Sequence, residues 1–319
     1  MEPANNSTPV SPISKNIDEF LDYLKVEKGS SPLTIRNYRH YLTRFDNWLT
    51  KNKSGHELKD INQDTVRHYR LYLAELSDGK HELLGRRTQS YHAIALRSFL
   101  KWLLKNDFDV LAPDKIDLPK VPDRQIKFLS GEHMERLLNA PTLSNIQGIR
   151  DKAILEVLYS TGLRVSEIVR LDRDRIDFNK REFGVIGKGG RARVVFLSKR
   201  SCEWLKKYLD SRTDHFRPLF IRHKGTIDPS TPDEKTRLTP RSMQRMMKKY
   251  VRKIKLPIDA TVHSIRHGFA TDLLMAGADL RSVQEMLGHK NVSTTQIYTH
   301  VTNKQLKDIH EAMHDKGGK

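Results

Sequence analysis

The chain has almost no cysteine: Cys202 is the only one among 319 residues. One thiol cannot form an internal disulfide, and it cannot supply the ligand set of a cysteine-rich zinc site. We expect Cys202 to pack against a helix as a small apolar side chain. The length allows one or two domains, each with a hydrophobic core of its own.

Long apolar runs are also missing from the sequence. No segment approaches the ~18 apolar residues that a membrane-spanning helix needs. The N-terminus, MEPANNSTPVSP, is polar and proline-rich, and it lacks the apolar core of a signal peptide. These features predict a soluble, cytoplasmic protein with a disordered segment over residues 1–13.

Acidic residues are scarce beside basic ones, since 39 Asp and Glu stand against 57 Lys and Arg, giving a net charge of +18. This excess favours a polyanionic partner, because each phosphate that the protein neutralises releases condensed counterions. A basic protein with a merely solvated surface would show the same balance. Charge therefore favours nucleic acid without identifying it.

Four amphipathic helices are predicted within residues 14–108. The first has apolar side chains at positions i, i+3, i+4 and i+7, namely Ile17, Phe20, Leu21 and Leu24. Ser31 followed by proline predicts the start of the second, and the polar residues from Asn62 predict the start of the third. The fourth follows Thr88 and carries Leu104 on its apolar face. Four such helices form a small bundle.

A change of composition marks the predicted boundary between two domains. Residues 109–127 contain the stretch LAPDKIDLPKVPDRQIK, with three prolines and few apolar residues. Such a composition is typical of an interdomain linker. We therefore expect one domain over residues 14–108 and a second over residues 128–319.

The second domain is predicted to be mostly helical with a small antiparallel sheet, which makes the fold mainly α (α+β). Helices are expected after Ser130, over residues 149–159, and after Ser198 and Thr239. Between them, residues 176–197 form short β-prone runs separated by Asn-Lys and Gly-Gly pairs.

The helix expected after Thr239 has two chemically different sides. One is apolar, with Met243, Met246, Met247, Tyr250 and Ile254. The other carries the cations Arg241, Arg245, Lys248 and Arg252. This separation is what a helix needs to pack on a core and present positive charge to DNA phosphates. A solvated face is the alternative interpretation.

Arginines and histidines in the second half of the chain suggest phosphate chemistry. A phosphodiester under attack gathers negative charge on its non-bridging oxygens, and a guanidinium stays charged and can bind two oxygens. Arg164 follows a Thr-Gly break, and Arg266 lies three residues after His263, on the same face of a predicted helix. A second histidine, His289, follows a helix that Asp279 caps and a glycine stops. The pattern differs from the HExxH form of a metal site, so we expect no metal.

Two further residues could complete such a site. Lys188 lies in a Gly-Lys-Gly-Gly turn between predicted strands, where an ammonium could protonate a leaving oxygen. Tyr298 follows Ser-Thr-Thr, and a phenol needs an activating neighbour to become a nucleophile. Taken singly, each residue named here is more often structural than catalytic.

Several segments resemble, in order, the motifs of the tyrosine recombinase family, particularly the Xer-type site-specific recombinases. They are GLRVSEI, GKGGRARVVFL, HSIRHGFATDLL, GADLRSVQEMLGH and STTQIYTHV. The likeness covers residues 128–302, and SSPLTIRNYRHYL is similar to that family's helical, SAM-like core-binding domain. Five motifs in order are far more specific than any one of them.

The resemblance implies a C-shaped, two-domain clamp around double-stranded DNA. It implies that Tyr298 is the nucleophile and forms a 3′-phosphotyrosyl link, with Arg164, Arg266 and His289 on the non-bridging oxygens. Recombination would then proceed through a Holliday junction, without ATP, metal or other cofactor.

Further roles follow from the same resemblance. Lys188 would protonate the leaving 5′-oxygen, His263 would serve the tyrosine proton or the oxyanion, and Glu167 would support Arg164. One departure is Val262, which stands where the family commonly has proline; it affects backbone stiffness rather than chemistry.

The tail carries Leu306, Ile309 and Met313 on one predicted helical face. This face could dock on a neighbouring subunit and close a cyclic tetramer on two DNA duplexes, or pack on its own subunit. A second recombinase or a DNA translocase could also be required as a partner.

Several functions remain compatible with the sequence. Dimer resolution of chromosomes or plasmids and integration or excision of a mobile element use the same chemistry, although the Xer-type role is favoured because no added N-terminal arm-binding domain is evident. A type IB topoisomerase shares the cations and the tyrosine. A non-catalytic DNA-binding regulator is a third alternative.

Overall fold

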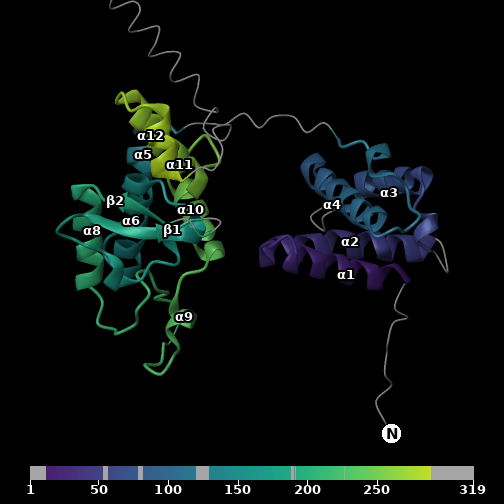
Figure 1. The fold of residues 1–319 in the computed structure, drawn as a ribbon. Coiled ribbons are helices and arrows are strands. Elements are labelled where there is room, and N and C mark those ends of the chain that lie inside the picture. Colours follow the sequence, from purple (N-terminus) through teal and green to yellow (C-terminus); the bar gives the residue numbers. More distant parts are fainter. Residues whose placement is uncertain are drawn as a thin grey trace, which may run out of the picture. The chain divides into compact units, whose positions relative to one another are not determined.

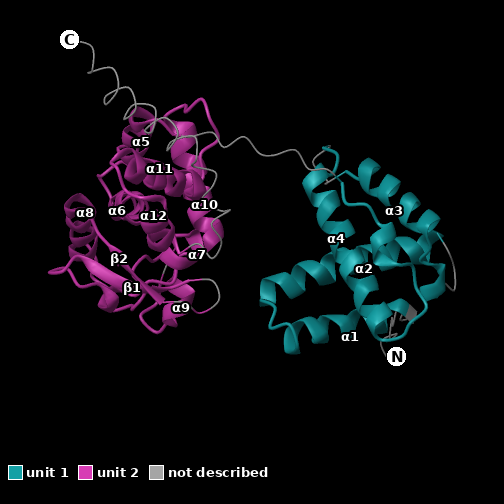
Figure 2. Ribbon diagram, turned by 45° about the horizontal axis from the view of Figure 1, so that its top comes forward, with its two compact units in different colours: residues 1–124 teal, residues 125–319 magenta. Residues whose placement is uncertain are grey.

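The computed structural model describes residues 12–52, 57–77, 82–119, 129–187, 190, 192–225 and 227–288. The chain divides into two compact units, residues 1–124 and residues 125–319 (Figure 1, Figure 2). Both units are mainly helical, and the sheet in the second has two antiparallel strands. The predicted fold class is therefore confirmed, whereas the clamp concerns the placement of the two units and stays a prediction.

The first unit is a bundle of helices around one apolar core. Its elements are α1 (Pro12–Val26), α2 (Pro32–Asn52), α3 (Gln63–Glu75) and α4 (Arg86–Lys105), with short 3₁₀ turns at Leu58–Asp60 and Pro113–Lys115. The predicted caps are present: the Ser31 hydroxyl accepts from Thr34 N at 3.2 Å, and Asn62 Oδ1 accepts from Thr65 N at 2.9 Å. The apolar faces of all four helices meet in this core, which confirms the predicted bundle.

Three local predictions for this unit were wrong. Helix α1 begins at Pro12 and Ile13 is fully buried, so the segment predicted as disordered contains two helical residues. Helix α4 begins at Arg86, before Thr88. Leu104 is 48% exposed, because its neighbours Leu100 and Leu103 already fill the inward face of α4.

Part of the predicted linker also belongs to the first unit. Ile116 is 1% exposed within the core, and Asp114 forms an ion pair with Arg97 of α4 at 2.6 Å. Ile116, together with the buried Pro113, anchors a segment whose composition otherwise indicates a linker. Residues 120–128 lie outside the described part of the chain.

The second unit is built around α6, which is buried along most of its length. In chain order its elements are α5 (Gly131–Leu138), α6 (Ile146–Thr161), α7 (Val165–Ile168), a 3₁₀ turn (Arg173–Arg175), β1 (Glu182–Ile186), β2 (Ala192–Phe196), α8 (Lys199–Asp210), α9 (Asp233–Thr236), α10 (Pro240–Lys253), α11 (Val262–Met275) and α12 (Leu280–Leu287). Helices α5, α8 and α11 and strand β2 pack on α6. Cys202 is buried on α8, as predicted.

Charged groups inside α6 are paired rather than isolated. Lys152 and Glu156 form an ion pair at 2.8 Å, and their side chains are only 4% and 3% exposed. Lys152 Nζ also donates to the Leu138 carbonyl at 2.8 Å. These partners offset the desolvation of the two charges, so α6 can occupy the centre of the unit.

Strands β1 and β2 form the predicted hairpin. The register runs from Glu182 opposite Phe196 to Ile186 opposite Ala192. Lys188 falls between the two strands in the sequence and lies outside the described residues. Among the helices of the described part, none is long and apolar enough to span a membrane.

Candidate active site

The position of Arg164 follows from a close approach of three helices. Helix α6 ends at Gly162, whose φ of +59° is the left-handed conformation that favours glycine. A Cβ at Gly162 would lie 2.5 Å from Phe269 Cδ1 of α11 and 3.0 Å from Leu287 Cδ2 of α12. Arg164 then caps α7, so the helix start and the glycine break predicted around it are both confirmed.

Arg266 projects from α11 into the same junction and is 4% exposed. Its Nη1 donates to the Gly162 carbonyl at 2.5 Å, and its Nη2 donates to the Leu287 carbonyl at 2.6 Å. The guanidinium thus ties the end of α6 to the end of α12. Charge-assisted bonds of this kind are stronger than bonds between neutral groups.

Arg164 also reaches the Leu287 carbonyl. Its Nη1 lies 3.4 Å from the Leu287 oxygen, and its Nη2 donates to the Gly288 oxygen at 3.1 Å. The last carbonyls of a helix lack partners within the helix and carry partial negative charge. The C-terminus of α12 therefore holds two guanidinium groups together, and the Arg164 side chain is still 25% exposed.

Glu167 lies behind this pair, with its side chain 4% exposed. Its Oε1 accepts from Arg164 Nη1 and its Oε2 accepts from the Arg164 backbone N–H, both at 2.9 Å. Burial alone would raise the pKa of Glu167, but hydrogen bonds from Arg193 and then Arg164 lower it to about 2. Glu167 is therefore ionised at neutral pH, in the place expected of a support for Arg164.

Arg193 was missed by the sequence analysis. Its Nη1 and Nη2 donate to the two carboxylate oxygens of Glu167 at 3.0 and 2.8 Å. One signal was available: Arg193 lies two residues before the buried Val195 and therefore on the same, inward face of β2. A charged residue on such a face requires a buried partner.

His263 lies on α11 three residues before Arg266, as predicted. Desolvation by the surrounding chain, followed by the positive charges of Arg266 and Arg164, lowers the pKa of His263 below its usual 6.5. The ring of His267 lies 6.3 Å from that of His263 between centroids, and desolvation, followed by the charges of His263 and Arg266, lowers its pKa to about 4. A neutral imidazole can accept a proton at neutral pH.

Three predicted site residues, Lys188, His289 and Tyr298, lie outside the described residues, as does the predicted tail helix. The predicted helix before His289 is confirmed as α12: Asp279 accepts from Ser282 N at 3.0 Å, and Gly288 ends the helix with φ +64°. The roles of these residues stay predictions.

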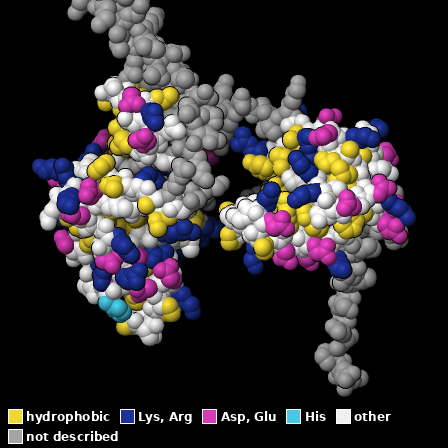
Figure 3. Space-filling view, in the orientation of Figure 1, with side chains coloured by type: hydrophobic (Ala, Val, Ile, Leu, Met, Phe, Trp, Pro, Cys, Tyr) yellow, Lys and Arg dark blue, Asp and Glu magenta, His cyan; other side chains and the backbone are white. Residues whose placement is uncertain are grey.

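Helix α10 shows the two sides that the sequence predicted. Its apolar residues are buried, whereas Arg241, Arg245, Lys248 and Arg252 are exposed. The helix packs against α7 and α11, the two helices that carry Arg164 and Arg266 at or near their starts. On the face drawn in Figure 3, basic side chains lie among acidic ones.

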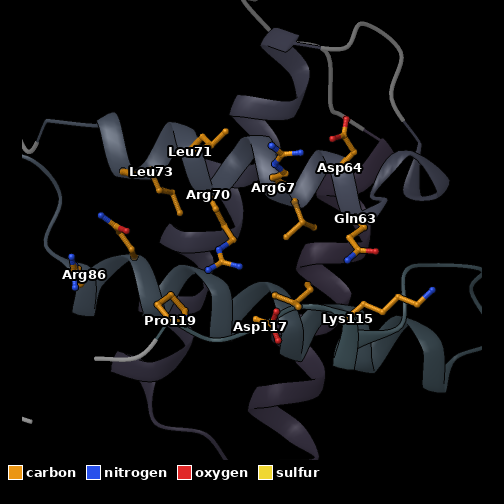
Figure 4. Close-up of a pocket in the computed structure, with 14 residues that line it drawn as sticks. Gln63, Asp64, Arg67, Arg70, Leu71, Leu73, Arg86, Lys115, Asp117 and Pro119 are labelled. Atoms are coloured by element: carbon orange, nitrogen blue, oxygen red, sulfur yellow. The ribbon is translucent and has the colours of Figure 1, made fainter. Parts of the chain in front are cut away.

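A pocket of about 820 Å³ lies in the first unit, between α3 and the segment that follows α4 (Figure 4). Arg67, Arg70 and Leu71 of α3 line one side, and Lys115 and Asp117 line the other. The paired arginines lie in the second unit, whereas this pocket is lined by residues of the first.

Two family descriptions match most of the chain. "Phage integrase family" matches residues 127–305, and "Phage integrase, N-terminal SAM-like domain" matches residues 17–107. The chain belongs to the phage integrase family. The recombinase motifs found in the sequence thus correspond to a family match over the second unit.

Relatives within the family agree with this assignment. "Tyrosine recombinase XerC" of Pelotomaculum thermopropionicum is 35% identical over 306 residues, which cover 94% of this chain and 98% of the relative. "Tyrosine recombinase XerD" of Lacticaseibacillus casei is 35% identical over 302 residues, covering 94% and 99%. The XerH recombinase in a post-cleavage complex with palindromic difH substrate has the same fold, with a TM-score of 0.67 at 21% identity, covering 96% of this chain and 90% of that one. This family member is a tyrosine recombinase of the Xer type, an enzyme that breaks and rejoins DNA.

Proposed function

We propose that this recombinase cleaves DNA through a 3′-phosphotyrosyl link at Tyr298 and resolves dimers of chromosomes or plasmids. One observation carries the proposal: Arg164 and Arg266 both reach the Leu287 oxygen, at 3.4 and 2.6 Å. Arg266 also bonds to Gly162, 104 residues away in the sequence. Two guanidiniums held this close form a binding site for an oxyanion.

The arginine pair would stabilise the charge that develops during cleavage. When the tyrosine oxygen attacks phosphorus, negative charge accumulates on the non-bridging oxygens. Arg164 is partly exposed and its Nη2 bond to Gly288 is 3.1 Å, so this guanidinium can exchange a carbonyl partner for phosphate. Arg266, which is buried, would hold the second side of the phosphate in a preorganised site.

Proton transfer completes the proposed reaction. The Tyr298 hydroxyl loses its proton to the His263 imidazole as its oxygen bonds to phosphorus, and the bond to the 5′-oxygen breaks. The ammonium of Lys188 protonates that leaving oxygen, and His289 binds a non-bridging oxygen. The phosphotyrosyl bond keeps the energy of the phosphodiester, so a new 5′-hydroxyl can reverse the step without ATP.

Strand exchange between two duplexes needs several active sites acting together. We propose a homotetramer on two double-stranded recombination sites, with a Holliday junction as the intermediate and a cytoplasmic location with access to the chromosome. The tail with Leu306, Ile309 and Met313 would dock on a neighbouring subunit. If a second recombinase or a DNA translocase is needed, the purified protein alone would cleave DNA but would not complete recombination.

The test is a covalent capture experiment with genomic DNA. Fragments with staggered nicks, which release a short 5′-hydroxyl strand and prevent rejoining, are incubated with the protein and the covalent complexes are sequenced. We expect adducts at one chromosomal site, and at plasmid sites, that vanish with Tyr298→Phe. Adducts at the ends of a mobile element would instead assign an integrase role.

Two other outcomes would contradict the proposal. Adducts spread over DNA without a preferred site, together with relaxation of any supercoiled plasmid, would indicate a topoisomerase-like enzyme. Adducts that persist in Tyr298→Phe would assign the nucleophile to another residue.

The exposed face of α10 provides a test of DNA binding. We propose that Arg245 and Lys248 contact phosphates, because the apolar side of α10 is buried against the core. Replacing either by alanine is expected to weaken binding evenly across sequences and to reduce the slope of log K against log salt by about 1. Binding isotherms at several salt concentrations measure this slope. Lys206→Ala, which removes an exposed lysine from α8, is the matched control and should leave the slope unchanged.

A further inference from the structure

Arg193 has a position in the second unit that its sequence context does not suggest. It lies on β2, and its side chain is 11% exposed. All three nitrogen atoms donate to protein acceptors: Nη1 and Nη2 to Glu167 at 3.0 and 2.8 Å, and Nε to the Met286 carbonyl at 3.1 Å. Arg193 is therefore anchored by the protein at each of its side-chain nitrogens, and no phosphate contact is assigned to it.

The partner of Arg193 is the carboxylate that supports Arg164. Glu167 Oε1 accepts from Arg193 Nη1 and from Arg164 Nη1, at 3.0 and 2.9 Å. One carboxylate thus joins two guanidiniums. Without Arg193, two of the four side-chain and backbone donors to Glu167 would be lost, and a single arginine would have to orient a buried carboxylate.

Arg193 also contacts the end of α12. The Met286 carbonyl accepts from Arg193 Nε, and a Cβ at Gly288 would lie 3.2 Å from Arg193 Nη1. The next carbonyl, that of Leu287, binds Arg164 and Arg266. Arg193 therefore links the hairpin to both structures that position the arginine pair, namely Glu167 and the α12 terminus.

We propose that Arg193 is a positioning residue for DNA cleavage: it aligns Arg164 through Glu167 and fixes the end of α12 against β2. This inference rests on the proposed function of the arginine pair. Because its two-pronged bond to a carboxylate needs a planar fork of donors, lysine cannot replace arginine here. Loss of this alignment slows the chemical step and leaves the contacts with DNA unchanged.

The experiment compares Arg193→Lys with Arg237→Lys in the full-length protein. Arg237 is a stringent control because its side chain is 12% exposed, bonds Asp172 at 2.8 Å and holds the Val169 and Leu171 carbonyls just after α7. The carboxylate partners of Arg237 are Asp172 and Glu234, and it does not bond to Glu167. Single-turnover cleavage is measured on a nicked duplex that carries the attachment site from the covalent capture, together with binding affinity and the melting midpoint.

We expect Arg193→Lys to cleave at least about threefold more slowly with binding within twofold of wild type, whereas Arg237→Lys cleaves at the wild-type rate. The decisive readout is a double-mutant cycle with Arg164→Ala, which is measurable because the nicked substrate accumulates adduct over hours. Because part of the effect of Arg193 passes through Arg164, Arg193→Lys is expected to cause a smaller loss in the Arg164→Ala background than in the wild-type background. The proposal is overturned if Arg193→Lys slows cleavage by less than about threefold in the wild-type background, or by the same factor in both backgrounds.

The two proposals fail in different ways. If Tyr298→Phe and Arg164→Ala abolish or slow cleavage but Arg193→Lys does not, only the role of Arg193 is wrong. If the wild-type protein forms no adduct that depends on Tyr298, the proposed function is wrong, and the role of Arg193 falls with it.

Discussion

Replacing Arg266 by alanine is expected to slow DNA cleavage by about 10²–10³-fold, which corresponds to roughly 2.7–4 kcal/mol of transition-state stabilisation. Arg266 is buried and is held by the Gly162 and Leu287 carbonyls, so its charge is fixed before DNA arrives. A fixed donor in a site of low dielectric stabilises developing charge without reorganising. DNA binding is expected to persist, because it depends on many exposed cations.

The measurement is single-turnover cleavage on a nicked site, with binding affinity measured separately. Arg266→Ala also removes the guanidinium donor of the Gly162 carbonyl and leaves the Leu287 carbonyl with only the longer bond from Arg164. An unsatisfied buried polar group costs about 1–3 kcal/mol. Arg266→Lys is therefore the informative companion, since it keeps the charge while losing the second hydrogen bond. Equal losses of binding and cleavage in both variants would contradict a role in the chemical step.

The arginine pair illustrates what local sequence can and cannot predict. Arg164 and Arg266 were identified from their motifs, and the Thr-Gly break before Arg164 predicted the helix end that precedes it. Their convergence on Leu287 depends on the packing of α6, α11 and α12, which no window of sequence contains.

Arg193 shows the same limit more clearly. In GGRARVV its spacing from Val195 indicates only that it faces inward, and its partner Glu167 lies 26 residues earlier. Ile116 is a comparable case in the first unit, because the prolines around it dominate the composition while its own side chain is buried. Helix starts at Ser31, Asn62 and Thr239 were predictable because a cap bonds within its own turn.

A substitution at Gly162 is expected to have the largest effect on stability. Alanine there would adopt the left-handed conformation at a cost of about 1–3 kcal/mol, and its Cβ would overlap Phe269, which adds roughly 1–3 kcal/mol of overpacking. The nearest atom would be Phe269 Cδ1 at 2.5 Å, in the small core that joins α11 to α12. We therefore expect Gly162→Ala to lower the free energy of unfolding of the second unit by about 2–6 kcal/mol, summing the two costs.

Scanning calorimetry of the full-length protein measures this loss, and a unit of this size shifts its midpoint by about 2–4 °C per kcal/mol. Gly277→Ala is the matched control, because Gly277 has φ +93° in the same unit and a Cβ at that position would meet no atom within 4 Å. It carries the backbone cost without the clash, so its midpoint should fall by less. Since Arg266 Nη1 binds the Gly162 carbonyl, Gly162→Ala should also slow cleavage at temperatures where the unit stays folded, whereas Gly277→Ala should not. Equal midpoints for the two variants would mean that Phe269 moves aside freely and that the junction of α6, α11 and α12 does not hold the arginine pair in place.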